Sequence, residues 1–91
     1  DAPPAATPRV ALAAHPNPAR GAVRFAAGTA NSAGAVLVFT VDGRRVSRLP
    51  LERGGATWDG RDVRGHLVPP GIYLARLEGD RSAAARFMWL N

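Results

Sequence analysis

Turn-forming residues interrupt this chain so often that they leave little room for a long helix. Ten glycines and eight prolines are spread over 91 residues, and both residue types weaken or end helices. The apolar segments between them are short, and most alternate with polar residues at the two-residue period of a half-buried strand. With 46% apolar residues for a core, the chain is predicted to be all-β.

Seven segments fit this strand pattern, with turn signals about every 8–12 residues, as in a β-sandwich. They are 9–14, 21–27, 35–41, 44–51, 56–58, 72–78 and 82–90. His15–Pro18 is expected to end the first strand, because neither proline can donate a ladder hydrogen bond. Segment 35–41 is apolar on both faces, which favours a central position in a sheet.

Two short turns and a core follow from the same pattern. Asp42-Gly43 predicts a hairpin with a type I′ turn, in which both central residues have positive φ, and Gly79-Asp80 predicts a second hairpin. The residues expected to be buried are Val10, Leu12, Val23, Phe25, Val36, Val38, Trp58, Tyr73, Leu77 and Phe87.

The chain divides into a short arm and one domain. Residues 1–8 (DAPPAATP) lack core-forming side chains, so they are predicted to be an extended linker or an assembly arm. Residues 9–91 form the sandwich. The first residue is Asp1 and not methionine, which favours a processed, exported protein or an excised fragment.

Composition narrows the possible chemistry. The absence of cysteine excludes disulfides, thiolate metal sites and thiol nucleophiles. All twelve basic residues are arginine and the net charge is +5, which indicates a solvated basic surface or, as a less favoured alternative, a polyanion-binding one. No apolar run approaches the ~20 residues of a membrane-spanning helix.

The side chains that could carry catalysis or bind metal do not form a recognisable set. His15 and His66 stand with Ser32, Ser47 and Ser82 in no known nucleophile motif, and Glu52 and Glu78 lie in ordinary strand positions. The spacing of Asp42, Asp59 and Asp62 does not match a calcium loop, and turn capping explains these carboxylates better. We expect no enzyme activity, no cofactor and no metal.

Nucleic acid is also a less favoured partner. The aromatic residues Phe25, Phe39, Trp58, Tyr73, Phe87 and Trp89 all fall inside strand patterns, which indicates a core and not a base-stacking surface. Non-specific, salt-dependent binding remains open for a domain this basic.

Several local motifs, in order, resemble the immunoglobulin-like domain of the flagellar hook-cap protein. They begin with Pro16, Asn17 and Pro18, continue with Asp42 and Gly43, and are sharpest at WDGRD, residues 58–62, followed by Gly65, Gly71 and Tyr73. The closing strand RFMWL, residues 86–90, completes the set, so the resemblance covers roughly residues 12–91. Such domains are related to the C-terminal sorting modules of the type IX secretion system.

The resemblance implies a small antiparallel immunoglobulin-like β-sandwich of about seven strands with a structural or docking role. The positions that carry it are Pro16, Asn17, Pro18, Asp42, Gly43, Trp58, Asp59, Gly60, Asp62, Gly65, Gly71 and Tyr73. The expected function is attachment or sorting of an exported, cell-surface protein, with an upstream domain or secretion machinery as partner. The alternative is a filament subunit that assembles with identical subunits through Pro3, Pro4, Pro8, Val10 and Leu12.

Overall fold

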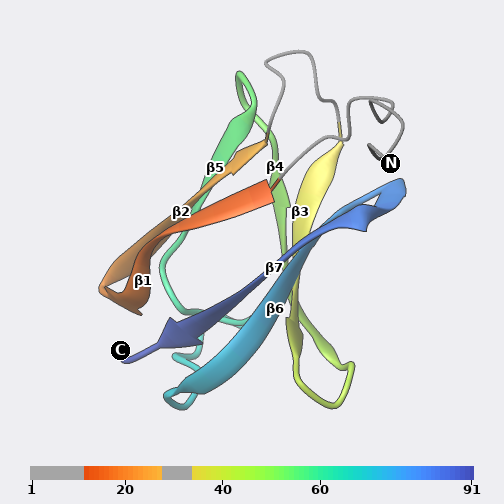
Figure 1. The fold of residues 1–91 in the computed structure, drawn as a ribbon. Helices are drawn as coiled ribbons and strands as arrows, with labels where there is room; N and C mark the ends of the chain where they lie inside the picture. The colour runs from red at the N-terminus through yellow and green to blue at the C-terminus, as the bar shows by residue number, and fades with distance from the viewer. Residues whose placement is uncertain (1–11, 28–33) are drawn as a thin grey trace, which may run out of the picture.

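Seven β-strands make up the described part of the computed structural model, which covers residues 12–27 and 34–91 (Figure 1). None of these residues belongs to a helix of the length and apolarity needed to cross a membrane. The strands are β1 (Leu12–Arg20), β2 (Ala22–Ala27), β3 (Ala35–Thr40), β4 (Arg45–Pro50), β5 (Gly55–Trp58), β6 (Gly71–Leu77) and β7 (Asp80–Trp89).

The strands form the two layers of a sandwich, joined along one side by β1. One sheet has the order β1-β2-β5 and the other the order β4-β3-β6-β7, and both are antiparallel. The end of β1 leaves the first sheet and pairs in parallel with β7, through Ala19 and Trp89. Figure 1 shows the two layers facing each other, with the end of β1 approaching the end of β7 near the C-terminus. The predicted all-β sandwich is therefore confirmed.

The sequence predicted that His15–Pro18 ends the first strand, and this prediction is wrong. The segment lies inside β1 and carries the strand from one sheet to the other. Pairing with β2 breaks off after His15, since the prolines have no N–H to donate. The side chain of Asn17 then takes the place of a backbone partner for β7. Its Oδ1 accepts the N–H of Met88 (2.9 Å), and its Nδ2 donates to the carbonyl oxygen of Arg86 (3.4 Å). The chain stays extended because this amide replaces the missing ladder bonds.

The core lies between the two sheets and matches the predicted set. Every member that the structure describes is buried, namely Leu12, Val23, Phe25, Val36, Val38, Trp58, Tyr73, Leu77 and Phe87, whereas Val10 lies outside the described residues. Trp89 is also buried, and its ring centroid lies 5.2 Å from that of Trp58. Phe87 contacts Trp58 edge to face at 5.8 Å, an arrangement that aromatic pairs favour.

The hairpin between β3 and β4 is present, but the predicted turn type is wrong. Only Gly43 has a positive φ (94°), whereas Asp42 does not. Gly43 donates its N–H to the carbonyl oxygen of Thr40 (2.9 Å), and Thr40 donates to that of Arg44 (2.8 Å). This is a three-residue loop closed by a glycine bulge. The carboxylate of Asp42 accepts a hydrogen bond from the Thr40 hydroxyl, which a type I′ turn does not require.

Candidate functional site

The loop that joins β5 to β6, residues 59–70, holds four of the twelve motif positions, Asp59, Gly60, Asp62 and Gly65. Trp58, the last residue of β5, precedes the loop; its ring is buried and its Nε1–H donates to the carbonyl oxygen of Arg61 (2.9 Å). Asp59 Oδ1 accepts the N–H of Arg61 (3.2 Å), two residues on, as predicted. We call residues 59–70 the tryptophan loop.

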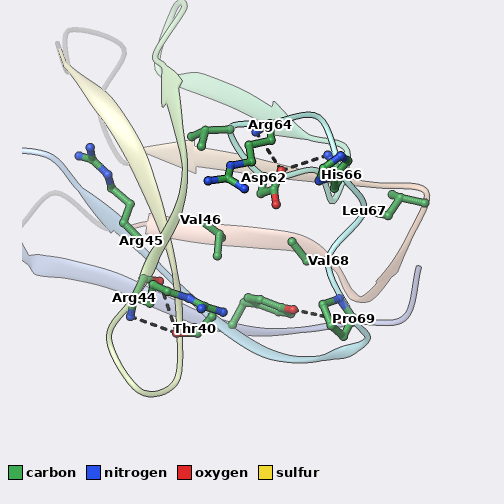
Figure 2. A pocket seen from close by; sticks show the side chains of 12 residues that line it. Thr40, Arg44, Arg45, Val46, Asp62, Arg64, His66, Leu67, Val68 and Pro69 are labelled. Atoms are coloured by element: carbon green, nitrogen blue, oxygen red, sulfur yellow. Dashed lines mark hydrogen bonds between the residues drawn. The ribbon is translucent and has the colours of Figure 1, made fainter.

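Asp62 organises the second half of the tryptophan loop. Its Oδ1 accepts the backbone N–H groups of Arg64 (2.9 Å) and His66 (3.0 Å), as the dashed lines in Figure 2 show. The hydrogen bond from His66 is the main reason that the pKa of Asp62 lies below its ordinary value; partial desolvation opposes it. The carboxylate therefore acts within the loop as a turn cap.

We expect the free energy of unfolding to fall at acid pH, and Asp62→Asn to remove part of that fall. Because the folded-state pKa of Asp62 is depressed, its contribution is complete above the unfolded value of about 3.9 and is lost as pH drops through the folded pKa. Thermal unfolding between about pH 2 and pH 7 should show the two proteins converging at the acid end. An equal difference at every pH would mean that the charge of Asp62 contributes nothing.

Two further motif residues fix the shape of the tryptophan loop. Gly60 has a φ of 80°, and a Cβ there would lie 1.9 Å from Cζ2 of Trp89. At the other end, the hydroxyl of Tyr73 donates to the carbonyl oxygen of Pro69 (2.6 Å). A tyrosine bonded to a backbone carbonyl just upstream is the corner found in immunoglobulin-like sandwiches. The motif positions in this loop are thus explained by structure.

The other motif positions, apart from Gly65, lie outside the tryptophan loop. Pro16, Asn17 and Pro18 form the crossing of β1, and Asp42 and Gly43 form the β3–β4 turn. Gly65 has a φ of 84° inside the tryptophan loop, and Gly71 begins β6. Of the assembly candidates, Leu12 is buried in β1, so it is not presented to a partner. Pro3, Pro4, Pro8 and Val10 lie outside the described residues.

The β3–β4 hairpin and the tryptophan loop together enclose an open hollow of about 490 Å³ at one end of the sandwich (Figure 2). Its floor is apolar and recessed, since Val46, Val68 and Tyr73 are all buried. Its rim includes two exposed aliphatic side chains from the tryptophan loop, Val63 (79% exposed) and Leu67 (57% exposed). The size falls within the range of roughly 300–1,000 Å³ that is common for ligand sites.

Positive charge surrounds this hollow. Arg44 and Arg45 come from the hairpin and Arg64 from the tryptophan loop, against the single carboxylate of Asp62. In Figure 2 the side chains of Arg44 and Arg64 extend from opposite walls toward the valines, whereas that of Arg45 points away. Among the described residues, ion pairs join Arg48 to Glu78 and Arg61 to Asp59 but involve none of these three arginines. The hollow can therefore hold an anionic group.

The histidines and carboxylates that were considered for catalysis or metal binding do not come together in the described part of the hollow. His66 lies on its exposed rim, and no hydrogen bond in residues 12–27 and 34–91 joins either histidine to the hydroxyl of Ser47. Within the same described residues no group of three potential ligands could hold a metal ion. Asp42, Asp59 and Asp62 each accept hydrogen bonds from their own turns. The apolar floor and the arginines of the hollow are suited to binding.

Sequence reasoning identified the arginines but not the hollow. Arg44 and Arg64 lie twenty positions apart in the sequence, and they meet at the hollow only because of how the hairpin and the loop pack. The aliphatic residues Val63 and Leu67 of this loop stay exposed in the fold. Apolar side chains that remain exposed around a concavity often mark an interaction site.

Comparison with known proteins gives one similar structure. No protein-family model matches the sequence, and no curated protein matches it. The fold is similar to part of PorZ, a bacterial surface component of the type IX secretion system of Porphyromonas gingivalis, with 24% identity and a TM-score of 0.68. The match covers 88% of this chain but only 11% of PorZ. The similarity is thus to a type IX component and not to a hook-cap protein, and at this identity it establishes the sandwich fold.

Proposed function

We propose that this domain is a non-catalytic docking or sorting module of an exported, cell-surface bacterial protein that depends on the type IX secretion system. The observation that carries the proposal is the match of nearly the whole chain, 88%, to a segment that makes up 11% of PorZ. A sandwich of this kind therefore occurs as one small part of a much larger surface protein.

The geometry supports a binding role over a catalytic one. The cationic hollow has an apolar floor, and the carboxylates in the tryptophan loop are engaged in shaping that loop. The outer strands β4 and β5 each end a sheet in the described part of the chain. Such edges present unpaired backbone groups that a protein partner can use.

A fusion experiment tests the secretion role. Residues 1–91 are attached to the C-terminus of a periplasmic reporter and expressed in a bacterium that has a type IX system. We expect the reporter to reach the cell surface or the medium, and to stay in the periplasm in a strain that lacks the system. The matched control carries an unrelated β-sandwich of similar size in place of this domain. Equal retention of both reporters in the secreting strain would rule out a sorting role.

A further inference from the structure

We infer that the hollow between the β3–β4 hairpin and the tryptophan loop binds an extended peptide segment of a protein partner that carries both acidic and aliphatic side chains. The inference rests on the proposed docking role and names the chemistry of the partner. Three observations support it, namely the charge of the walls, the depth of the floor and the neighbouring sheet edge.

The charge of the walls selects a carboxylate. Arg44 and Arg64 approach the hollow from two different segments of the chain (Figure 2). Neither forms an ion pair with any residue that the structure describes. A guanidinium group offers a planar set of donors that matches a carboxylate. Acidic side chains of a partner would therefore meet two unengaged arginines, one on each wall.

The recessed apolar floor of the hollow favours an aliphatic side chain as the ligand over the flat surface of a membrane. Val46 and Val68 are each only 8% exposed, so they lie below the arginine rim. A lipid bilayer cannot reach a recessed floor, and a free phosphate gains nothing from an apolar one. An aliphatic side chain can enter the hollow, where it removes apolar surface from water. Leu67, exposed on the rim, extends the same apolar contact.

The neighbouring sheet edge provides the backbone contacts. β4 is the outer strand of its sheet and pairs only with β3 among the described strands. Arg45 and Val46, at the start of β4, line the hollow. An extended peptide can add to such an edge through main-chain hydrogen bonds, and its alternate side chains then point to opposite faces. A peptide with an acidic residue and an aliphatic residue two positions apart directs both side chains to the same face, so it fits the edge and the hollow together.

The test measures fluorescence anisotropy of a labelled, end-capped peptide that repeats Glu-Ser-Leu-Ser, in which glutamate and leucine share one face, added to the intact 91-residue chain. We expect saturable binding that weakens with salt. Peptides with glutamine in place of every glutamate, or with serine in place of every leucine, should bind at least about tenfold more weakly, since each lacks one of the two contacts. Equal binding of all three peptides would overturn the inference.

Variants locate the site. The double variant Arg44→Gln/Arg64→Gln should raise the Kd about tenfold or more. The matched control, Arg20→Gln/Arg86→Gln, removes the same charge from exposed positions outside the hollow and should leave the Kd within about twofold. Leu67→Ser should also weaken binding while thermal unfolding stays unchanged. If both double variants lose affinity equally, only net charge matters and the proposed site is wrong.

Competition experiments with inorganic phosphate and with lipid vesicles distinguish the peptide from two other possible ligands of the hollow. Inorganic phosphate that displaces the peptide fully at low concentration would show a simple anion site. Vesicles of equal parts phosphatidylcholine and phosphatidylglycerol that displace it, with the same loss in Arg44→Gln/Arg64→Gln, would show a membrane site; either result overturns the inference. If the reporter fusion is secreted but the domain does not bind the peptide, this inference is wrong and the secretion role stands. If the domain binds the peptide but the reporter fusion is not secreted, only the secretion role is wrong.

Discussion

Gly60→Ala will lower the free energy of unfolding by about 2–5 kcal/mol, as the sum of two effects. The first is backbone strain, because the φ of 80° lies in the left-handed region, which costs an alanine about 1–2 kcal/mol. The second is a steric clash, because the new Cβ would lie 1.9 Å from Cζ2 of Trp89. Trp89 is buried and cannot move aside freely, and forcing extra atoms into a packed core costs about 1–3 kcal/mol.

The same loop contains the control that separates these effects. Gly65 has nearly the same φ, 84°, but no atom lies within 4 Å of a Cβ placed there. Gly65→Ala should therefore show the strain alone, about 1–2 kcal/mol. Urea unfolding of both variants measures the difference, which is the cost of the clash with Trp89. Equal losses in the two variants would mean that the core accommodates the new methyl group.

Trp58→Ala will lower the free energy of unfolding by about 3–5 kcal/mol. The indole is 1% exposed and packs against three aromatic rings, those of Tyr73 (5.6 Å), Phe87 (5.8 Å) and Trp89 (5.2 Å) between centroids. Its removal leaves a cavity at the centre of the core and leaves the carbonyl oxygen of Arg61 without its indole donor. Native proteins have free energies of unfolding of about 5–15 kcal/mol, so this single change removes a large part of the stability.

Two further variants make this result interpretable. Trp58→Phe keeps an aromatic ring in the core but loses the hydrogen bond to Arg61, so we expect it to fold with a smaller loss than Trp58→Ala. Val63→Ala changes an exposed side chain in the same loop and should stay within about 0.5 kcal/mol of the parent. If Trp58→Ala melts with the parent protein in calorimetry, the packing described for Trp58 is wrong.

The strands and the core were predictable because their signal is local. Alternation at Val23 and Phe25 places both on one face, and the structure buries both. The apolar run in β3 predicted a central strand, and β3 does lie between β4 and β6. Residues such as Asp59 act on N–H groups two positions away, so their role also follows from sequence distance alone.

Errors arose where a distant segment determines the local conformation. The prolines at 16 and 18 predicted a strand end, because the sequence alone does not show that Asn17 bonds to β7, some seventy residues away. The type I′ turn at Asp42-Gly43 was wrong because the register of β3 against β4 shifts at Phe39, which requires a longer loop with a bulge. Trp89 was expected to join the core with the other aromatic residues and is buried, but its close approach to Gly60 is seen only in the tertiary structure.

The sequence by itself determined that this chain is an all-β sandwich, where most strands and turns lie, and which residues fill its core. These properties follow from side-chain periodicity and from the conformational limits of glycine and proline, which act over a few residues. Only the tertiary structure decided that β1 joins the two sheets and that Arg44 and Arg64 meet across a hollow floored by Val46 and Val68. That arrangement depends on the packing of segments about twenty residues apart or more, which local periodicity does not encode.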